Sequence, residues 1–582
     1  MIADTLASLL LARAEDDRPG LVHEGRVWSW REHVAACLAA GARLSARGTG
    51  THVGVLSENV PELVVLIGGA ALAGHVVVAL NPTRSVDELI RDARATDVDL
   101  VLTDESCGGI GRAVSEALGV TALPLAAEAN STAPEAAAPE TAASEDAAPE
   151  DAALEDVVPA PGDLVMLIFT SGTSGRPRAV RITQRKLALP GASLAALLTP
   201  EDAVYCSMPL FHSGALMAAY APAVASGAAL VLRRRFSASG LLPDIRRYGC
   251  TYLHYVGKAL SYVLATPEQP DDAANPLRIA FGNEGSAVAV RRFGERFGCR
   301  VIDAFGSTET AISLIPDPAG PPGCLGRLPE GVRILNPFTT RPCPPARIED
   351  GRLLNPDEAI GELVNTAGLG LFEGYYNDPD ADAERIRDGA FWSGDLAYQD
   401  ADGYVFFAGR GTERLRVDGE NLAVAPIEAA LREFGGVVEA AVYPVPDPAA
   451  GDQVMAALVL AGTPDPGASA SGAPDPAASG PAVLDPAASG PAVFDPVAFA
   501  AFLASRRDLG AKSLPRFVRL CRELPQTASH KVIKRHLARD AWRTTDPVWM
   551  RGPDGLRLLT EADVKGIEEE FVRHGRQHLL ET

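Results

Sequence analysis

Short apolar runs rich in Val, Ile and Leu recur along residues 50–306, and stretches with a helical pattern separate them. Because these runs are largely apolar, without regular polar alternation, they are typical of strands that are largely buried on both faces. Strands that alternate with helices predict layered α/β structure. We predict strands in "HVGVLS", "VVVAL", "VDLVLTD", "VMLIFTS", "AALVLRR", "TYLHYVG", "LRIAFG" and "RVIDAFG".

One apolar stretch, residues 63–80, has the length of a membrane span. However, the preceding "SENVPE" offers Asn59 as a helix cap and Pro61 in a first helical turn. Gly74 and His75 then interrupt the run. We predict a helix, a turn and a buried strand within a globular domain, with peripheral membrane contact as the alternative.

Two segments do not follow the α/β pattern. Residues 126–161 are mostly Ala, Pro, Glu and Asp, and residues 463–496 contain the repeated decamers "DPAASGPAVL" and "DPAASGPAVF". Neither segment buries enough apolar surface to offset the entropy of ordering, so we predict flexible surface insertions. These two segments carry much of the net charge of −22. The rest of the chain has no excess of basic residues that would indicate nucleic-acid binding.

The eight cysteines are widely scattered, without a C-x-x-C pair. This distribution argues against a disulfide framework and a zinc site, and fits a reducing compartment. The N-terminal residues have no basic region before an apolar run, so a signal peptide is not expected. We predict a cytoplasmic protein.

The segment "AGRGT", residues 408–412, has two glycines around Arg410, and a smaller α/β pattern follows it. We predict a boundary here. A large N-terminal domain would span 1–409 and a small, mobile α+β domain 410–582.

The segment "IFTSGTSGRPRAV", residues 168–180, concentrates small and cationic residues after a predicted strand. Its glycines permit tight turns and close approach to a ligand, its hydroxyls are donors, and Arg176 and Arg178 offer forked donors for phosphate oxygens. It does not match the Walker pattern, and taken alone it equally suits a surface turn. The loop residues are Thr170, Ser171, Gly172, Thr173, Ser174 and Gly175.

This loop resembles the phosphate loop of the adenylate-forming superfamily of acyl-CoA synthetases, peptide-synthetase adenylation domains and luciferases. Five further motifs resemble the same superfamily in the same order, which makes chance an insufficient explanation. The closest resemblance is to the fatty-acid-transport-protein and carnitine-CoA-ligase group. The motifs are "PLFHSGA" (209–215), "DAFGSTET" (303–310), "FWSGDLAYQDADGY" (391–404), "GRGTERLRVDGENLAVAPIEAAL" (409–431) and "LPQTASHKVIKRHL" (524–537).

The resemblance implies an enzyme that activates a carboxylic acid with ATP and Mg²⁺ as acyl-AMP and then transfers the acyl group to CoA. Because the acid and the triphosphate are both anionic, cations and donors are the main catalytic need. The loop would hold the β- and γ-phosphates. The resemblance further implies that Thr308 hydrogen-bonds phosphate and that Glu309 binds Mg²⁺. Phe305, beside Gly306, would stack on adenine, and Asp395 with Arg410 would bind the ribose.

The resemblance assigns adenylation to Lys531, as a cation between the substrate carboxylate and the α-phosphate. A small domain that rotates after adenylation would present the CoA-binding face. The hinge and this face are assigned to Thr412, Gly419 and Glu420. The acyl pocket is assigned to His212, Gly282, Asn283 and Glu284, although His212 equally suits a core position.

The sequence departs from the superfamily pattern at several points. Arg178 stands where lysine is usual, Gln184 where histidine is common, and Ser529–His530 precede the lysine in place of a small residue and glycine. The identity of the acid stays open between a fatty acid and a bulky or specialised acid of secondary metabolism. An enzyme that stops at acyl-AMP, or passes it to a carrier protein or partner enzyme, is the alternative; the oligomeric state is also open.

Overall fold

The structure is a computed structural model that divides into two compact units, residues 1–332 with 364–393, and residues 333–363 with 394–582. It describes residues 4–48, 50–129, 158–171, 177–257, 259–285, 287–349, 352–410, 415–417, 420–422, 424–448, 452–461, 494–506, 509, 513–526, 532–552, 555–574 and 576–580. The large and small α/β parts that the sequence predicts are confirmed. The domain boundary at 409/410 stays a prediction.

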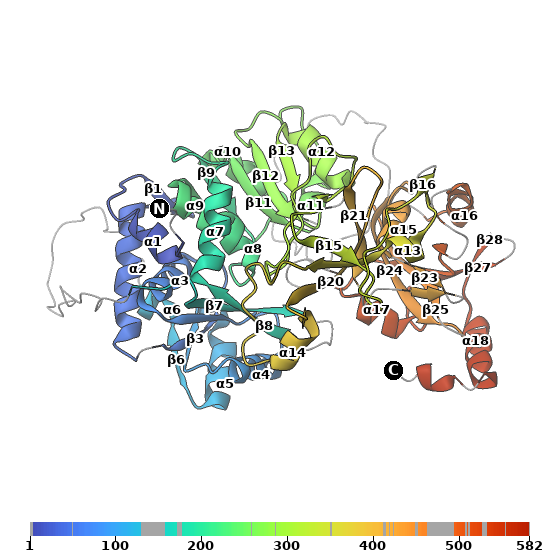
Figure 1. Ribbon diagram of the computed structural model, residues 1–582, viewed down its shortest axis with the longest axis horizontal. Coiled ribbons are helices and arrows are strands. Elements are labelled where there is room, and N and C mark those ends of the chain that lie inside the picture. Colours follow the sequence, from blue (N-terminus) through green and yellow to red (C-terminus); the bar gives the residue numbers. More distant parts are fainter. Residues whose placement is uncertain are drawn as a thin grey trace, which may run out of the picture. The chain divides into compact units, whose positions relative to one another are not determined.

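The first unit is built around two large sheets (Figure 1). The larger sheet is parallel except at its edge, where β2 runs antiparallel to β1. Its strand order is β13 (Arg300–Asp303), β12 (Ile279–Asn283), β11 (Tyr252–Val256), β9 (Ala203–Cys206), β10 (Ala229–Leu232), β1 (Pro19–His23) and β2 (Arg26–Ser29).

The second sheet of this unit is also parallel except for its last strand, which returns antiparallel as a hairpin. All eight strands predicted from apolar runs are confirmed, because each falls in one of these two sheets. The strand order is β6 (Thr121–Pro124), β5 (Leu100–Thr103), β3 (His52–Leu56), β4 (Val76–Ala79), β7 (Leu164–Ser171) and β8 (Pro177–Thr183).

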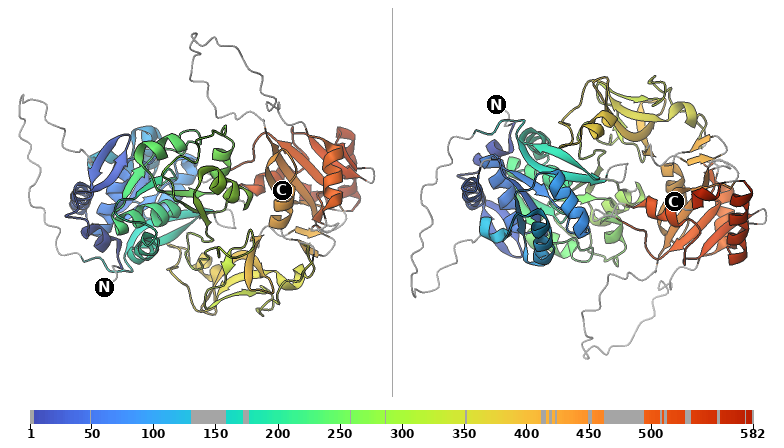
Figure 2. Two further views of the ribbon diagram at one scale, coloured as in Figure 1. Left: turned by 90° about the horizontal axis from the view of Figure 1, so that it is seen from above. Right: turned by 90° about the horizontal axis from the view of Figure 1, so that it is seen from below.

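Helices form three layers around the two sheets, and Figure 2 gives two further views of them. The helices α2 (Trp30–Ser45), α3 (Pro61–Ala73), α7 (Gln184–Ala195) and α9 (Ala221–Ser226) share one core with both sheets. The outer face of the larger sheet packs on α10 (Leu241–Tyr248), α11 (Ala259–Leu264) and α12 (Ala287–Phe297). The outer face of the other sheet packs on α4 (Val86–Ala95) and α5 (Gly108–Leu118).

The apolar stretch at 63–80 forms the predicted helix, turn and strand, with Gly74 in the left-handed conformation at φ 74° after α3. The predicted helix cap is wrong. Val60 precedes the helix, and the Asn59 amide instead donates to the carbonyl oxygens of Met208 and Arg233, at 2.9 and 3.1 Å. In the described part of the chain, every helix is too short or too polar to cross a bilayer.

The second unit is built around a five-stranded sheet with a core on each face. One core includes α15 (Val424–Leu431) and α16 (Pro496–Ser505), and the other includes α17 (Lys534–Asp540) and α18 (Glu561–Arg573). The strand order is β24 (Val437–Pro446), β25 (Asp452–Leu460), β26 (Phe517–Cys521), β27 (Val548–Gly552) and β28 (Gly555–Leu558).

The chain passes between the two units within three strands, β15 (Val332–Leu335), β18 (Gly361–Asn365) and β20 (Ala390–Gln399). In the second unit, β20 pairs antiparallel with β21 (Tyr404–Arg410). A short hairpin of β22 (Leu415–Val417) and β23 (Glu420–Leu422) follows.

The predicted insertions fall mostly outside the described residues, but their edges do not. Residues 126–128, assigned to the first insertion, belong to helix α6 (Leu125–Glu128). The Glu128 carboxylate is 2 % exposed and accepts a hydrogen bond from Arg47 at 2.5 Å. The pair joins a buried carboxylate, in residues that composition alone assigned to the insertion, to an arginine whose side chain is 42 % exposed.

Candidate active site

The phosphate loop is the connection between two antiparallel strands. Strand β7 ends at Thr170 and Ser171, and Thr170 lies opposite Arg178 on β8. Residues 172–176, which include Gly172, Thr173, Ser174 and Gly175, lie outside the described residues. The structure therefore fixes where the loop begins and ends.

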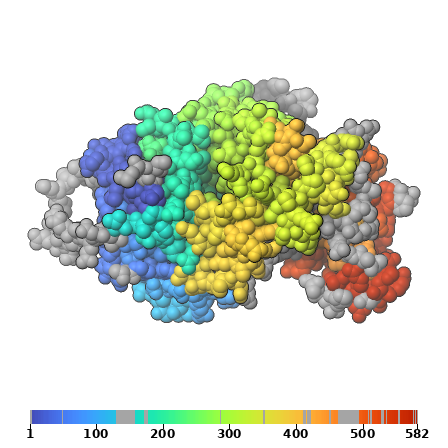
Figure 3. All heavy atoms as spheres, in the orientation of Figure 1, coloured from blue at the N-terminus to red at the C-terminus, as the bar shows by residue number. Residues whose placement is uncertain are grey.

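Arg178 lies at the base of this loop, and the residue is 4 % exposed. Its Nη2 donates to the carboxylate of Glu384 on α14 (Pro379–Arg385), and its guanidinium carbon lies 5.4 Å from the centre of the Tyr375 ring. Burial disfavours the cation, but the hydrogen bond and charge of Glu384 outweigh it and hold the pKa of Arg178 above its ordinary value. Figure 3 shows the golden segment around α14 at the surface of the first unit.

The second Arg178 nitrogen, Nη1, is buried and has no hydrogen-bond partner among the described residues. A buried donor without an acceptor is costly, and most such groups in proteins are paired. This donor therefore suits an anionic ligand at the loop.

The motif "DAFGSTET" forms a closed loop after β13. Its base is fixed by paired backbone hydrogen bonds between Phe305 and Leu314, at 2.8 and 2.9 Å. Gly306, Thr308 and Glu309 lie within it. The Thr308 hydroxyl is 3.0 Å from the Ser213 hydroxyl, so this loop contacts the "PLFHSGA" segment.

Glu309 and the phosphate loop are joined through Tyr375. The Tyr375 hydroxyl donates to Glu309 Oε1 at 2.9 Å, while the same ring lies beside Arg178. Burial alone raises the pKa of Glu309, but hydrogen bonds from its own backbone, Tyr375 and Ser307 outweigh it and lower the pKa. Glu309 is therefore a carboxylate at neutral pH.

The Glu309 carboxylate fits Mg²⁺. This ion is commonly held by one or two carboxylates together with substrate phosphates and water. No group of three or more His, Cys, Asp or Glu side chains within the described ranges is arranged to hold a metal ion. A Mg²⁺ site in which Glu309 supplies one ligand and substrate phosphates and water supply the others agrees with these residues.

We predict that Tyr375→Phe raises the Mg²⁺ concentration needed for half-maximal pyrophosphate release about 10-fold, because metal ligands depend on their hydrogen-bond partners. Tyr376→Phe is the matched control, since that hydroxyl donates to Asp97 at the same 2.9 Å. An equal shift in both variants would show that Tyr375 has no special relation to Glu309.

Lys186, which sequence reasoning missed, is a fully buried lysine. Its Nζ donates to the carbonyl oxygen of Arg181 at 3.2 Å and lies 5.8 Å from the centre of the Phe372 ring. Burial lowers the pKa of Lys186 to about 8, against the opposing charges of Glu309 and Glu373. Lys186 therefore adds a buried positive charge near Glu309.

The residues assigned to the acyl pocket lie around the carboxyl ends of β11 and β12. His212 is partly buried, with its ring centre 4.7 Å from that of Phe211. Gly282 and Asn283 end β12, and a Cβ at Gly282 would lie 2.1 Å from the Tyr255 carbonyl oxygen. Glu284 is exposed with φ 61°, so it does not carry the cost of a buried carboxylate.

Asp303 lies beside this segment. Its Oδ1 accepts from the Tyr255 hydroxyl at 2.8 Å and the Gly285 amide at 2.9 Å. Burial raises the pKa of Asp303 to about 6, and the charge of Glu284 adds to the rise.

We predict that Asp303→Asn increases the free energy of unfolding at pH 7.5 by about 1 kcal/mol. This gain is well below the energy that corresponds to the full rise of the Asp303 pKa, because Asp303 is partly exposed and solvent screens its charge. Between about pH 4 and pH 6 the folded protein binds a proton that the unfolded chain has lost, so the contribution of Asp303 falls as pH rises. Urea unfolding of the parent and the variant at pH 7.5 and at about pH 4 tests this prediction. The stability gained by Asp303→Asn should vanish near pH 4, and an equal gain at the two pH values would contradict the prediction.

The other predicted residues belong to the second unit. Asp395, 8 % exposed, lies on β20 opposite Arg410 on β21. Glu420 begins β23. Thr412, Gly419 and Lys531 lie outside the described residues, so their roles stay predictions.

Comparison with known proteins decides the family, since residues 11–376 match the family described as AMP-binding enzyme. The chain belongs to the AMP-binding enzyme family. It is 43 % identical over 596 residues to the steroid-22-oyl-CoA synthetase of Rhodococcus jostii, covering 99 % of each chain. It is 44 % identical over 550 residues to the medium/long-chain-fatty-acid–CoA ligase FadD17 of Mycobacterium tuberculosis, covering 94 % of this chain and 98 % of that one.

Solved structures agree on the fold. ATP-bound MatB from Rhodopseudomonas palustris has a TM-score of 0.72 at 24 % identity, over 92 % of this chain and 98 % of that one. The O-succinylbenzoate CoA synthetase MenE from Bacillus subtilis, with ATP and magnesium, has a TM-score of 0.69 at 21 % identity, over 91 % and 98 %. At the level of the AMP-binding enzyme family, the predicted acid–thiol ligase that uses ATP, Mg²⁺ and CoA is confirmed.

Proposed function

We propose that this chain converts a large, mainly apolar carboxylic acid to its acyl-CoA through an acyl-AMP intermediate. The observation that carries the proposal is the connected set of Arg178, Tyr375 and Glu309 at the base of the phosphate loop. It combines a buried cationic donor with an ionised carboxylate, as a magnesium-bound triphosphate requires.

In the first step, an oxygen of the substrate carboxylate attacks the α-phosphorus of ATP. The bond from that phosphorus to the bridging oxygen breaks, and pyrophosphate leaves. Arg178 and the 170–175 loop hold the terminal phosphates, Thr308 donates to phosphate, and Lys531 stabilises the charge that develops between the two substrates. Glu309 would hold Mg²⁺, which neutralises phosphate charge when bound.

Asp395 with Arg410 binds the ribose, and Phe305 supports the adenine. In the second step, the CoA sulfur attacks the acyl carbonyl carbon and AMP leaves. We assign the hinge and the thiol-binding face to Thr412, Gly419 and Glu420. The cytoplasm supplies ATP and CoA and keeps the scattered cysteines reduced.

The class of acid is suggested by two relatives whose names refer to a steroid acid and to medium- or long-chain fatty acids. Pyrophosphate release with a panel of such acids, with and without CoA, tests the proposal when products are identified by mass. Acyl-CoA should appear only with acid, ATP and CoA present. Acyl-AMP that persists despite CoA would favour transfer to a carrier protein or partner enzyme.

A further inference from the structure

A buried hydrogen-bond acceptor lies on β11, beside the acyl-pocket segment. His254 is 2 % exposed, and its Nδ1 lies 3.1 Å from the Phe281 carbonyl oxygen. Because a carbonyl only accepts, Nδ1 carries the hydrogen and Nε2 presents a bare lone pair. Burial lowers the pKa of His254 to about 4, so the ring is neutral at pH 7.

The Nε2 atom of His254 is buried and makes no hydrogen bond within the described residues. The same holds for the Oδ1 atom of Asn283 on the neighbouring strand. In the parallel register, His254 is paired with Phe281 and Val256 with Asn283. Since strand side chains alternate, His254 and Asn283 point to the same face of the sheet.

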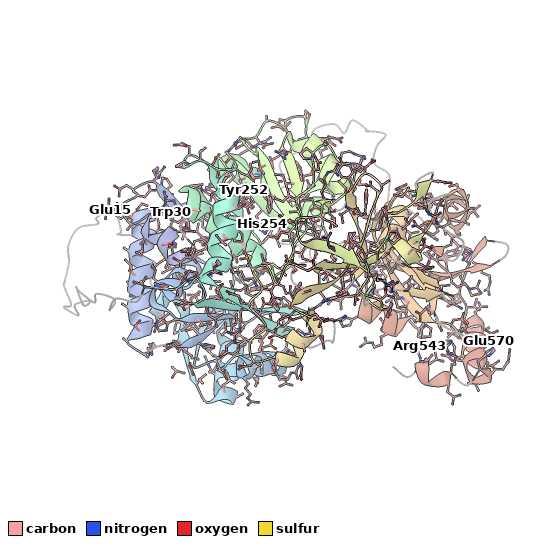
Figure 4. All side chains as sticks on the ribbon, in the orientation of Figure 1. Glu15, Trp30, Tyr252, His254, Arg543 and Glu570 are labelled. Atoms are coloured by element: carbon pink, nitrogen blue, oxygen red, sulfur yellow. The ribbon has the colours of Figure 1, made fainter. Side chains whose placement is uncertain are left out.

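That face is covered by α8 (Ser213–Ala215) and the following π-helical turn η2 (Leu216–Tyr220). A Cβ on Gly214 would lie 2.8 Å from His254 Nε2, and the Tyr252 hydroxyl on the same face donates to the Ala218 carbonyl oxygen at 3.0 Å. Figure 4 marks Tyr252 and His254 in the interior of the first unit. His254 thus adjoins α8, which leads directly into a π-helical segment, an irregularity frequent at functional sites.

This face is close to the reacting end of the proposed site. Ser213, next to Gly214, hydrogen-bonds Thr308. Apolar neighbours surround the two acceptors, including Val256 and Phe281. A ligand group that satisfies them therefore lies near the carboxyl group of the acid and carries a hydrogen-bond donor.

We propose that His254 and Asn283 form a specificity site for a hydroxyl group close to the carboxylate of the acid substrate. This inference rests on the proposed function and adds a substrate class to it. The hydroxyl donates to His254 Nε2, and the Asn283 amide, flipped so that its nitrogen faces the ligand, donates the second hydrogen bond to the hydroxyl oxygen. An unsubstituted acid leaves both buried groups unpaired, which lowers its kcat/KM about 10- to 100-fold.

The test uses the full chain with dodecanoic, 3-hydroxydodecanoic and 12-hydroxydodecanoic acids, and measures kcat/KM for pyrophosphate release. The parent should prefer the 3-hydroxy acid by about 10- to 100-fold over the other two. His254→Asn retains a donor near the position of Nδ1 and removes Nε2, so the preference should fall to near one. Asn283→Leu is a second variant that should also reduce it.

His23→Asn is the matched control, because His23 is buried on the same sheet and its Nδ1 lies 3.1 Å from the Leu232 carbonyl oxygen. Its preference for the 3-hydroxy acid should equal that of the parent. A parent that does not discriminate, or a preference that survives in His254→Asn, overturns the inference alone. If His254→Asn does not fold, an unchanged preference in Asn283→Leu overturns it. Pyrophosphate release with none of the proposed classes of acid overturns the proposed function as well.

Discussion

Replacing Lys531 by alanine should lower the rate of acyl-AMP formation about 1000-fold. A close charge contact at intermediate dielectric contributes about 4 kcal/mol, which corresponds to a rate change of that size. The measurement is single-turnover formation of acyl-AMP from ATP and acid, in the absence of CoA.

Lys565→Ala is the control, because Lys565 is an exposed lysine on α18 in the same unit. A second readout separates the two half-reactions. Since the resemblance assigns Lys531 to adenylation alone, the Lys531 variant should convert chemically prepared acyl-AMP and CoA to acyl-CoA near the parent rate. Formation of acyl-AMP at the parent rate would mean that the proposed role of Lys531 is wrong.

Glu309→Gln should lower kcat/KM for magnesium-bound ATP about 100-fold, since one preorganised charged group at a reacting phosphate is worth this much or more. Glutamine keeps the shape of the side chain and the acceptor for Tyr375 but loses the ionised oxygen. Pyrophosphate release over a range of Mg²⁺ concentrations measures the loss. Glu295→Gln, an exposed residue of α12, is the control.

The double variant tests whether Tyr375 acts through Glu309. If it does, adding Tyr375→Phe to Glu309→Gln should cost little more, because residues in one network are not additive. Full additivity would separate the two residues. Unchanged magnesium dependence in Glu309→Gln would remove the carboxylate from the metal site.

The strands of the first unit were predictable from sequence because continuous burial leaves a continuous apolar run. Strand β4, "VVVA", is buried at every position, and β5 and β9 follow the same rule. The Asn59 cap was not predictable in the same way. Its role depends on Met208 and Arg233, which are 149 and 174 residues away in the chain.

In the candidate site, too, the sequence predicted the residues that belong to local motifs and missed those that depend on distant contacts. Local motifs identified Thr308, Glu309 and Arg178, since glycine, hydroxyl and charge patterns are visible within a few residues. Tyr375 was missed because its significance lies in contacts with residues 66 and 197 positions earlier. The pattern "GYYND" around it has no feature that separates Tyr375 from its neighbour Tyr376.

The buried hydrogen-bond acceptor of His254 was likewise not predictable from the sequence. The run "TYLHYVG" predicts a strand, and a histidine within it is most simply a core residue. Only the pairing of Nδ1 with a carbonyl oxygen, and the lack of a donor for Nε2 among the described residues, point to a ligand.

The most direct test of the central claim is to follow oxygen-18 from the carboxyl group of the acid through one complete turnover with ATP and CoA. Attack of the carboxylate on the α-phosphorus predicts one labelled oxygen in AMP for every acyl-CoA formed. Label in inorganic phosphate with release of ADP, or AMP without label, would contradict an acyl-AMP intermediate.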